Sequence, residues 1–392
     1  MGGVGGSIKR ARAPSAADVA LLWAGASPWP DPRRVAEAAN GADPALVMEA
    51  AARHRVASLV LRAVEKAGCA LSPERLPIVR WTRLREAHTR VAIEAALQRA
   101  LDPLEAAGLR PMVLKGLSVL HRYPHPFLRP MDDIDLLLPR PIAFEAARLL
   151  ASKGWRPAAH RGRDPRYDLL FTHASVPGVA LELHYEFTTW RERPPGLETS
   201  RLWSERVPTN VMGRPAWGLP PELELLVLVV HATKRFHLLK RLIWMSDVAL
   251  VASTPGFDWG TFDRLASEAR RRVAAAVSLA IAERLGARVP DELLQLPRPG
   301  LAEALAPMLD PARPFEPRPQ THPWVTYALI DDVAGRARLA VAEAVRPSGS
   351  RKRGRVLREL ARVVLAGFRH GRSRAGTTPS AAAAPRSRPS LP

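Results

Sequence analysis

The stretch MVLKGLSVLHRYPHPFLRPMDDIDLLL, residues 112–138, sets the interpretation of the whole chain. An apolar run leads into Lys115 and Gly116, a proline-rich segment follows, and Asp133 and Asp135 then alternate with apolar residues into a run of leucines. Carboxylates at positions i and i+2 of a strand project from the same face. Like charges held that close repel each other unless a cation lies between them. A hard divalent cation such as Mg²⁺ is the natural partner of paired carboxylate oxygens.

The turn at Lys115 and Gly116 lies upstream of this pair and predicts a place for phosphate. Backbone N–H groups of a glycine turn can hold a triphosphate, Lys115 could neutralise its charge, and Gly116 would allow the backbone to approach closely. The alternative is a plain strand-to-helix turn. For the two aspartates the alternative is a solvated acidic cluster, but the following leucines indicate a buried strand, where unpaired carboxylates are costly. The combination indicates metal-assisted phosphoryl or nucleotidyl transfer.

A third carboxylate on a neighbouring strand is usual in two-metal transfer. The run LELH, residues 181–184, supplies Glu182 and places His184 on the same face of a strand, with leucines on the other face. Glu182 could bind metal, or it could accept the proton of an attacking hydroxyl. An exposed face of an edge strand is the alternative. For His184 we expect a structural or substrate-contacting role rather than metal ligation.

Two charged residues precede the aspartate pair. Asp132 should face away from Asp133, because neighbouring strand residues alternate, and we expect it to cap or bond Arg129. Arg129 could contact a phosphate or a carboxylate. A salt bridge from Arg129 to Asp132 or Asp135 is equally consistent with the sequence.

The later apolar segments carry a second group of candidates. His231 and Lys234 are three residues apart and would share a helix face. Lys234 could reach a nucleotide phosphate, and Asp247, three residues after Trp244, could orient Lys234 or pair with it. The alternative is a solvated basic face together with a buried ion pair.

The composition sets limits on the class of protein. At 392 residues the chain is long enough for two or three domains, and 47% apolar residues is ordinary for a globular protein. Its one cysteine, Cys69, excludes a disulfide framework and a cysteine-based zinc site within the chain. No apolar run reaches the roughly 18 residues of a membrane span, and the N-terminus lacks the apolar core of a secretory signal. We therefore expect a cytoplasmic protein without a membrane partner.

The net charge of +20 is unevenly distributed. Residues 336–392 contain 14 Lys and Arg against two acids, so most of the excess lies away from the carboxylate motif. A solvated tail is the default interpretation, and weak contact with nucleic acid is the alternative.

Hydrophobic periodicity predicts five regions. They are a disordered N-terminus (1–16), an N-terminal helical region (17–107), an α/β core (108–219), a C-terminal helical domain (220–345) and a basic, largely disordered tail (346–392). Within them we predict helix starts at Asp43-Pro44 and Ser72-Pro73, where a cap residue precedes proline. We also predict strands over residues 110–115 and 133–138, a hairpin of residues 167–175 and 179–187, antiparallel helices over 221–236 and 238–252, and one helix over 262–285.

The blocks LKG, RPMDDIDLLL, LELHYEF, LLVLVVHATKR and RLIWMSDVALV, in this order over roughly residues 35–285, closely resemble the uncharacterised nucleotidyltransferase family of the DNA polymerase β-like superfamily. The resemblance implies an α+β fold, in which a small mixed β-sheet nucleotidyltransferase core has N-terminal helices and a C-terminal helical domain that closes over the nucleotide. By the superfamily pattern, Asp133 and Asp135 look like the metal-binding carboxylates. Glu182 stands where the third carboxylate belongs, and Gly116 where the phosphate-turn glycine does.

The chain departs from the wider superfamily near this glycine. Leu117 stands where a serine or a second glycine is usual, with Ser118 one place late, and the spacing from Gly116 to Asp133 is longer than in compact members. The resemblance therefore implies a reaction type, while the details of triphosphate binding and the acceptor stay open.

We therefore expect an enzyme that binds an NTP, such as ATP, with two Mg²⁺ ions (Mn²⁺ being the alternative) at Asp133, Asp135 and Glu182. It would transfer a nucleoside monophosphate to an acceptor hydroxyl or phosphate on a small molecule, RNA or protein, and release pyrophosphate. The alternative is a non-catalytic nucleotide- or RNA-binding protein that uses the fold and the basic tail. The residues expected around the nucleotide are Lys115, Gly116, Ser118, Arg129, His184, Lys234 and Asp247.

Overall fold

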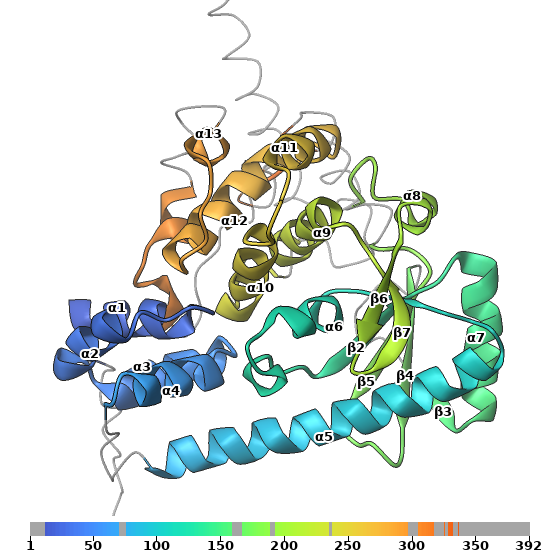
Figure 1. Cartoon of the computed structure of the whole chain (residues 1–392), viewed down its shortest axis with the longest axis horizontal. Helices are drawn as coiled ribbons and strands as arrows, with labels where there is room; N and C mark the ends of the chain where they lie inside the picture. Colours follow the sequence, from blue (N-terminus) through green and yellow to red (C-terminus); the bar gives the residue numbers. More distant parts are fainter. Residues whose placement is uncertain are drawn as a thin grey trace, which may run out of the picture. The chain divides into compact units, whose positions relative to one another are not determined.

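The computed structural model contains a mixed β-sheet, and helices that precede and follow the sheet in the sequence flank it (Figure 1). The structure describes residues 12–69, 76–158, 167–188, 193–234, 237–296 and 305–316, together with 325, 328–331 and 336. Residues 1–331 form one compact unit. The α+β class expected from the sequence is confirmed, whereas the division at residues 108 and 220 stays a prediction.

The first three helices that precede the sheet begin at residues whose side chains cap them: Ser15, Asp31 and Asp43. Asp43 accepts hydrogen bonds from the backbone of the first turn that follows Pro44, so this predicted helix start is confirmed. The predicted start at Ser72-Pro73 lies outside the described residues, as do residues 1–11 of the predicted disordered N-terminus and the whole predicted basic tail. Of the predicted disordered N-terminus, residues 12–16 are described, and Ser15 caps α1, which begins at Ala16. These helices are α1 (Ala16–Ala26), α2 (Pro32–Gly41), α3 (Pro44–Arg53), α4 (Ala57–Lys66) and α5 (Leu76–Ala106).

In the described chain the sheet has seven strands in the order β3-β4-β5-β2-β1-β7-β6. The predicted hairpin is confirmed, because β4 and β5 pair antiparallel. Central strand β2 is antiparallel to β1 and parallel to β5, which brings segments far apart in the sequence together. The strands are β1 (Met112–Val113), β2 (Asp133–Leu137), β3 (Trp155–Pro157), β4 (Asp168–His173), β5 (Ala180–His184), β6 (Val207–Val211) and β7 (Arg214–Gly218).

Three strands at or next to the edges of the sheet were not predicted from the sequence. Strands β6 and β7 contain Pro208 and Pro215 and little apolar alternation, so they give a weak strand signal. Strand β3 has only three residues. All three lie at or next to an edge of the sheet, where proline is tolerated because one side of the strand needs no ladder partner.

The two faces of β2 and β5 meet different cores. Ile134 and Leu136 of β2, with Leu181 of β5, belong to a core that contains residues of α5 and of α7 (Arg140–Ser152). Leu137, which alternates with them, belongs to the larger core built by the N-terminal and C-terminal helices. Figure 1 shows α5 as the long helix that runs past the sheet. The polar residues of β2 and β5 therefore face the helices of the larger core.

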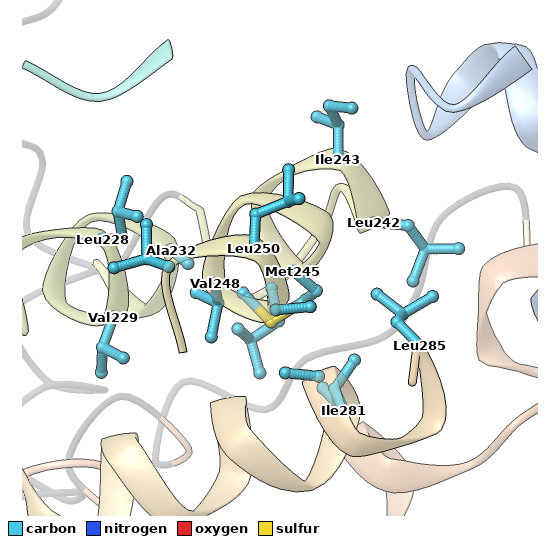
Figure 2. Packing of buried hydrophobic residues seen from close by; sticks show 14 of the residues in the cluster. Leu228, Val229, Ala232, Leu242, Ile243, Met245, Val248, Leu250, Ile281 and Leu285 are labelled. Atoms are coloured by element: carbon cyan, nitrogen blue, oxygen red, sulfur yellow. The ribbon is translucent and has the colours of Figure 1, made fainter. Parts of the chain in front are cut away.

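The C-terminal helices form an apolar layer around α10. Figure 2 shows Val248 and Met245 of α10 between residues of α9, such as Leu228, and residues of α12, such as Ile281. The predicted antiparallel helices correspond to α9 and α10. The helices are α9 (Pro221–Thr233), α10 (Leu242–Ala252), α11 (Trp259–Glu268), α12 (Arg272–Arg284) and α13 (Asp291–Leu294). Short helical turns elsewhere are α6 (Gly116–Val119), η2 (Leu120–Arg122), η3 (Pro126–Leu128), α8 (Thr199–Ser204) and η4 (Arg313–Phe315).

The single helix predicted over residues 262–285 is wrong, because the chain breaks between α11 and α12. Arg270 has a φ of 56°, a left-handed conformation that ends a helix. The backbone N–H of Arg271 then donates to the carbonyl of Ala266 at 2.8 Å. The sequence gives no warning, since glycine or asparagine usually occupies such a position.

Among the described residues, no helix combines the length and apolar character that crossing a bilayer requires.

Candidate active site

The parallel pairing of β2 with β5 brings the predicted carboxylates together in the middle of the sheet. Asp135 lies directly opposite Glu182 in the register, and His184 lies opposite Leu137 two residues further along. Since side chains alternate between faces, Asp133, Asp135, Glu182 and His184 all project from the same face. This is the face toward the larger helical core.

Lys115, Asp135, Glu182 and His184 form a buried cluster on this face. His184 Nε2 lies 2.8 Å from Asp135 Oδ1 and 3.5 Å from Glu182 Oε2. The ammonium of Lys115 pairs with Asp135 and lies 3.6 Å from Glu182 Oε2 and 3.3 Å from His184 Nε2. Each of the four side chains belongs to a residue no more than 8% exposed. Ligand atoms of the two acids and the histidine all lie within 4.8 Å of one another, a donor set that could hold a metal ion.

Charge in the cluster shifts the pKa of its members. Burial disfavours the charged amine of Lys115, but Asp135 and Glu182 outweigh burial, so the pKa of Lys115 is raised. For His184, burial and the positive charge of Lys115 lower the pKa, whereas hydrogen bonds to Asp135 and Glu182 raise it. The hydrogen bonds to the two acids have the larger effect, so the pKa of His184 lies above its ordinary value. The acids thus hold positive charge tightly at this point of the sheet.

Asp133 lies at the more open end of the same face and is half-buried. Burial raises its pKa, and the negative charges of Asp135 and Glu182 raise it further, to about 6. It is outside the tightest ligand set, which contains His184 instead. The three predicted carboxylates therefore share a face, and the structure adds His184 and Lys115 to the group.

The turn between β1 and α6 brings Lys115 into the cluster through an unusual backbone. Lys115 has φ 54° and ψ −123°, a conformation rare for a residue with a side chain. A Cβ on Gly116 would lie 2.9 Å from Met131 Sδ and 3.2 Å from Arg129 Nη2, so a larger residue here would require the Met131 side chain to shift. The Ser118 hydroxyl donates to the Lys115 carbonyl at 3.0 Å and stabilises the turn.

The predicted pairing of Asp132 with Arg129 is wrong. Arg129 is buried and donates from Nε and Nη2 to Asp247 of α10, at 2.9 and 2.8 Å, and Tyr123 donates to the same carboxylate at 2.7 Å. Asp132 instead pairs with Arg55, which follows α3. Local sequence spacing suggested the first pairing, but contacts between distant segments decide both. Arg129 and Asp247 thus link the core to the helical layer.

Lys234 follows the end of α9, and its partner differs from the one the sequence suggested. Its ammonium lies 4.8 Å from the ring centroid of Phe187, just beyond β5, in a cation–π arrangement. Asp247 is occupied by Arg129 and Tyr123, so the predicted contact between Asp247 and Lys234 is wrong.

Two arginines near Asp133 were missed by the sequence analysis. The negative charge of Asp133 acts on both Arg55 and Arg241, although burial lowers the pKa of each. Arg241 is half-buried, stacks over Trp244 at 5.5 Å, and makes no ion pair within the described ranges. The only sequence signal was an arginine three residues before Trp244. Together with Lys115 and Arg129, these residues surround the open end of the acidic face with positive charge.

The protein has an α+β fold in which acids and a histidine converge on one buried face of a mixed sheet. Their ligand atoms could hold a metal ion. The chain belongs to the uncharacterised nucleotidyltransferase family, whose sequence model matches residues 40–287. It is therefore a nucleotidyltransferase, an enzyme that transfers phosphorus-containing groups. The resemblance inferred from the motifs is confirmed. Comparison with curated proteins and with solved structures found no match.

Proposed function

We propose that the protein transfers a nucleoside monophosphate from an NTP to an acceptor hydroxyl or phosphate, with Mg²⁺ ions held by Asp133, Asp135 and Glu182. The acceptor oxygen would attack the α-phosphorus, forming a new P–O bond as the bond to the β-phosphate oxygen breaks. Pyrophosphate would leave with the bonding electrons, and the acceptor proton would pass to a carboxylate or to water. Bound divalent ions would neutralise the triphosphate and lower the pKa of the acceptor.

The observation that carries the proposal is the convergence of Asp135 and Glu182, in register on parallel strands, within a chain of this family. Two buried acids side by side need a compensating cation. Lys115 supplies one positive charge for both of them, and the half-buried Asp133 adds a third negative charge nearby. This excess of negative charge suits a divalent ion better than it suits a single ammonium.

The cations around Asp133 support a binding place for the triphosphate. Arg241 is the strongest candidate for direct contact, because its guanidinium is only partly covered and has no carboxylate partner among the described residues. Arg129 already pairs with Asp247. It would therefore contribute through the electrostatic field of its positive charge and by shaping the turn at Gly116, and not by direct contact with phosphate. A guanidinium can bind phosphate oxygens through two parallel hydrogen bonds, which would orient the β- and γ-phosphates.

The test is transfer of label from α-³²P-labelled NTPs by the full-length protein with Mg²⁺, with and without cell extract as a source of acceptor. We expect label on a product with the wild type and none with Asp133→Asn or Asp135→Asn. Asp132→Asn is the matched control, because Asp132 pairs with Arg55 and is not part of the acidic cluster. The control should retain transfer to within a few-fold.

The proposal fails if Asp135→Asn transfers label as fast as the wild type while remaining folded by circular dichroism. Equal loss in Asp132→Asn and Asp135→Asn would point to a general structural effect of substitutions in β2. The chemical class of the labelled product would identify the acceptor as a small molecule, an RNA or a protein.

A second candidate function is nucleotide binding without turnover. It is favoured by Lys115, which lies among the acids and satisfies part of their charge without any metal. This alternative predicts that nucleotide binds equally well with and without divalent ions, and that no label is transferred to any acceptor. Equilibrium binding of a fluorescent NTP with and without EDTA separates the two functions.

A further inference from the structure

We infer that His184 is a direct metal ligand of this site and that the site consequently binds Mn²⁺ in preference to Mg²⁺. The inference rests on the proposed function and adds to it the identity of the ion and a nitrogen donor. The sequence alone favoured a structural or substrate-contacting role for His184. Four features of the cluster argue for ligation instead.

The first is the position of the imidazole. His184 is fully buried, and its Nε2 lies 2.8 Å from Asp135 Oδ1 and 3.5 Å from Glu182 Oε2. In an octahedral site with metal–ligand distances of about 2.1 Å, adjacent ligand atoms lie about 3 Å apart. Asp135 and His184 already have that spacing, and Glu182 would need to move only slightly.

The second is that the cluster already holds a cation where the ion would lie. Lys115 Nζ pairs with Asp135 and lies within 3.6 Å of both His184 Nε2 and Glu182 Oε2. The ammonium therefore stands in for a metal ion among the same three donors. An ion and Lys115 cannot occupy this point together, so metal binding requires the flexible lysine side chain to move out.

The third is the direction of the ring, whose Nε2 points into the cluster. Within the described residues, His184 Nδ1 has no hydrogen-bond partner, so the polar contacts of His184 are those of Nε2 with the cluster. Tyr167 stacks on the ring at 5.9 Å and keeps it in one plane. A buried imidazole held with one nitrogen toward two acids is oriented for a shared cation.

The fourth is the chemistry of the donor set. Mg²⁺ selects oxygen donors and keeps much of its water, whereas imidazole is a good ligand for first-row transition metals. Mn²⁺ accepts carboxylate and imidazole together, and it resembles Mg²⁺ in charge and octahedral geometry. A site of two carboxylates and one histidine should therefore discriminate in favour of Mn²⁺.

The experiment is pulsed electron paramagnetic resonance of Mn²⁺ bound to the full-length protein, with a non-hydrolysable NTP analogue present. We expect nitrogen coupling to Mn²⁺ that changes from the ¹⁴N to the ¹⁵N pattern when the protein is labelled with ¹⁵N-histidine. In His184→Gln the coupling should vanish, and the affinity for Mn²⁺ should fall by at least about 10-fold. Even substitution of a residue that only hydrogen-bonds to a metal ligand lowers metal affinity by about that factor. Mg²⁺ affinity should fall less.

His173→Gln is the matched control, since His173 ends β4 on the same sheet and is not among the clustered ligands. It should leave both coupling and affinity unchanged. Mn²⁺ bound tightly without nitrogen coupling in the wild type would overturn the inference and leave carboxylate-based transfer intact. If Mn²⁺ does not bind at millimolar concentrations, both this inference and the proposed metal-dependent transfer are overturned. The wild-type spectrum alone decides the matter if His184→Gln does not fold.

Discussion

Asp135 on β2 and Glu182 on β5 lie directly opposite each other in a parallel register, and the ammonium of Lys115 lies between them. In a parallel ladder the register fixes which side chains share a face, so a shift of β5 by one residue would turn Glu182 and His184 into the apolar core. The leucines at 181 and 183, both fully buried, make that shift very costly. The apolar residues of β5 thereby hold its polar residues at the site.

The first prediction concerns Glu182. Glu182→Gln keeps the shape of the side chain but removes a charge. We expect nucleotidyl transfer to fall about 100-fold or more, because the proposed metal ion that Glu182 would help to hold supplies several kcal/mol of transition-state stabilisation. The measurement is the rate of label transfer at saturating NTP. Glu186→Gln is the control, because Glu186 pairs with Arg193 away from the cluster, at 2.9 Å. A loss in both variants would show a general effect on the strand end.

The second prediction concerns Lys115, whose charge is the main compensation for the buried acids. Lys115→Met should lower the free energy of unfolding of the metal-free protein by about 3–5 kcal/mol, because it leaves buried carboxylates unpaired. Mn²⁺ should restore much of that loss, and it should bind this variant more tightly than the wild type, since no ammonium has to leave. Urea denaturation with and without Mn²⁺ measures both effects.

The exposed residue Lys153 gives the control for that experiment, and Lys153→Met should leave stability and metal response unchanged. If Mn²⁺ stabilises Lys115→Met no more than it stabilises the wild type, the ammonium and the ion do not compete for one position. Lys115 would then be a structural partner of Asp135 only.

The acidic motif could be recognised from the sequence because its signals are local. Asp133 and Asp135 are two residues apart in an apolar run, and Glu182 and His184 alternate with leucines in another. These patterns predicted β2, β5 and their polar faces. They could not give the register between strands, so the contact of Asp135 with His184, 49 residues away, needed the three-dimensional structure.

The partners of the ion pairs could not be predicted from the sequence either. Arg129 was expected to bond its near neighbour Asp132, but it pairs with Asp247, 118 residues away, and Asp132 pairs with Arg55, 77 residues away. Periodicity reports which face of an element is buried and carries no information about which charged residue lies across the contact. For the same reason Arg241 could not be placed beside Asp133 before the fold was known.

The third prediction follows from the Arg129–Asp247 pair. Asp247 is 1% exposed and accepts hydrogen bonds from Arg129 and Tyr123. Asp247→Asn would leave a buried guanidinium without its counter-charge, so the free energy of unfolding should fall by about 3–5 kcal/mol. Glu268→Gln, which removes the exposed partner of Arg264, should cost less than about 1 kcal/mol. Equal, small effects in urea denaturation would show that the buried pair contributes little.

The fourth prediction concerns pH and Glu86 on α5. Glu86 is buried, and Ser58 donates a hydrogen bond to it. Burial raises the pKa of Glu86 from its ordinary value of 4.5 to about 7, against the nearby charge of Arg85. A carboxyl group whose pKa is higher in the folded state than in the unfolded state favours folding while it is protonated. Its contribution is therefore largest below about pH 4.5, falls as the pH rises to about 7, and is constant above that.

The size of the effect is the difference in pKa times about 1.4 kcal/mol, which gives about 3 kcal/mol as an order of magnitude. Glu86→Gln cannot ionise, so its stability relative to wild type should increase by about this amount between pH 4.5 and pH 8. Urea denaturation of both proteins at these two pH values gives the difference directly and cancels the titration of all other groups. Glu94→Gln, an exposed position on the same helix, should differ from wild type by less than about 1 kcal/mol at either pH. If Glu86→Gln and the wild type differ by the same amount at both pH values, the carboxylate of Glu86 remains ionised in the folded protein, and the nearby arginines then outweigh burial.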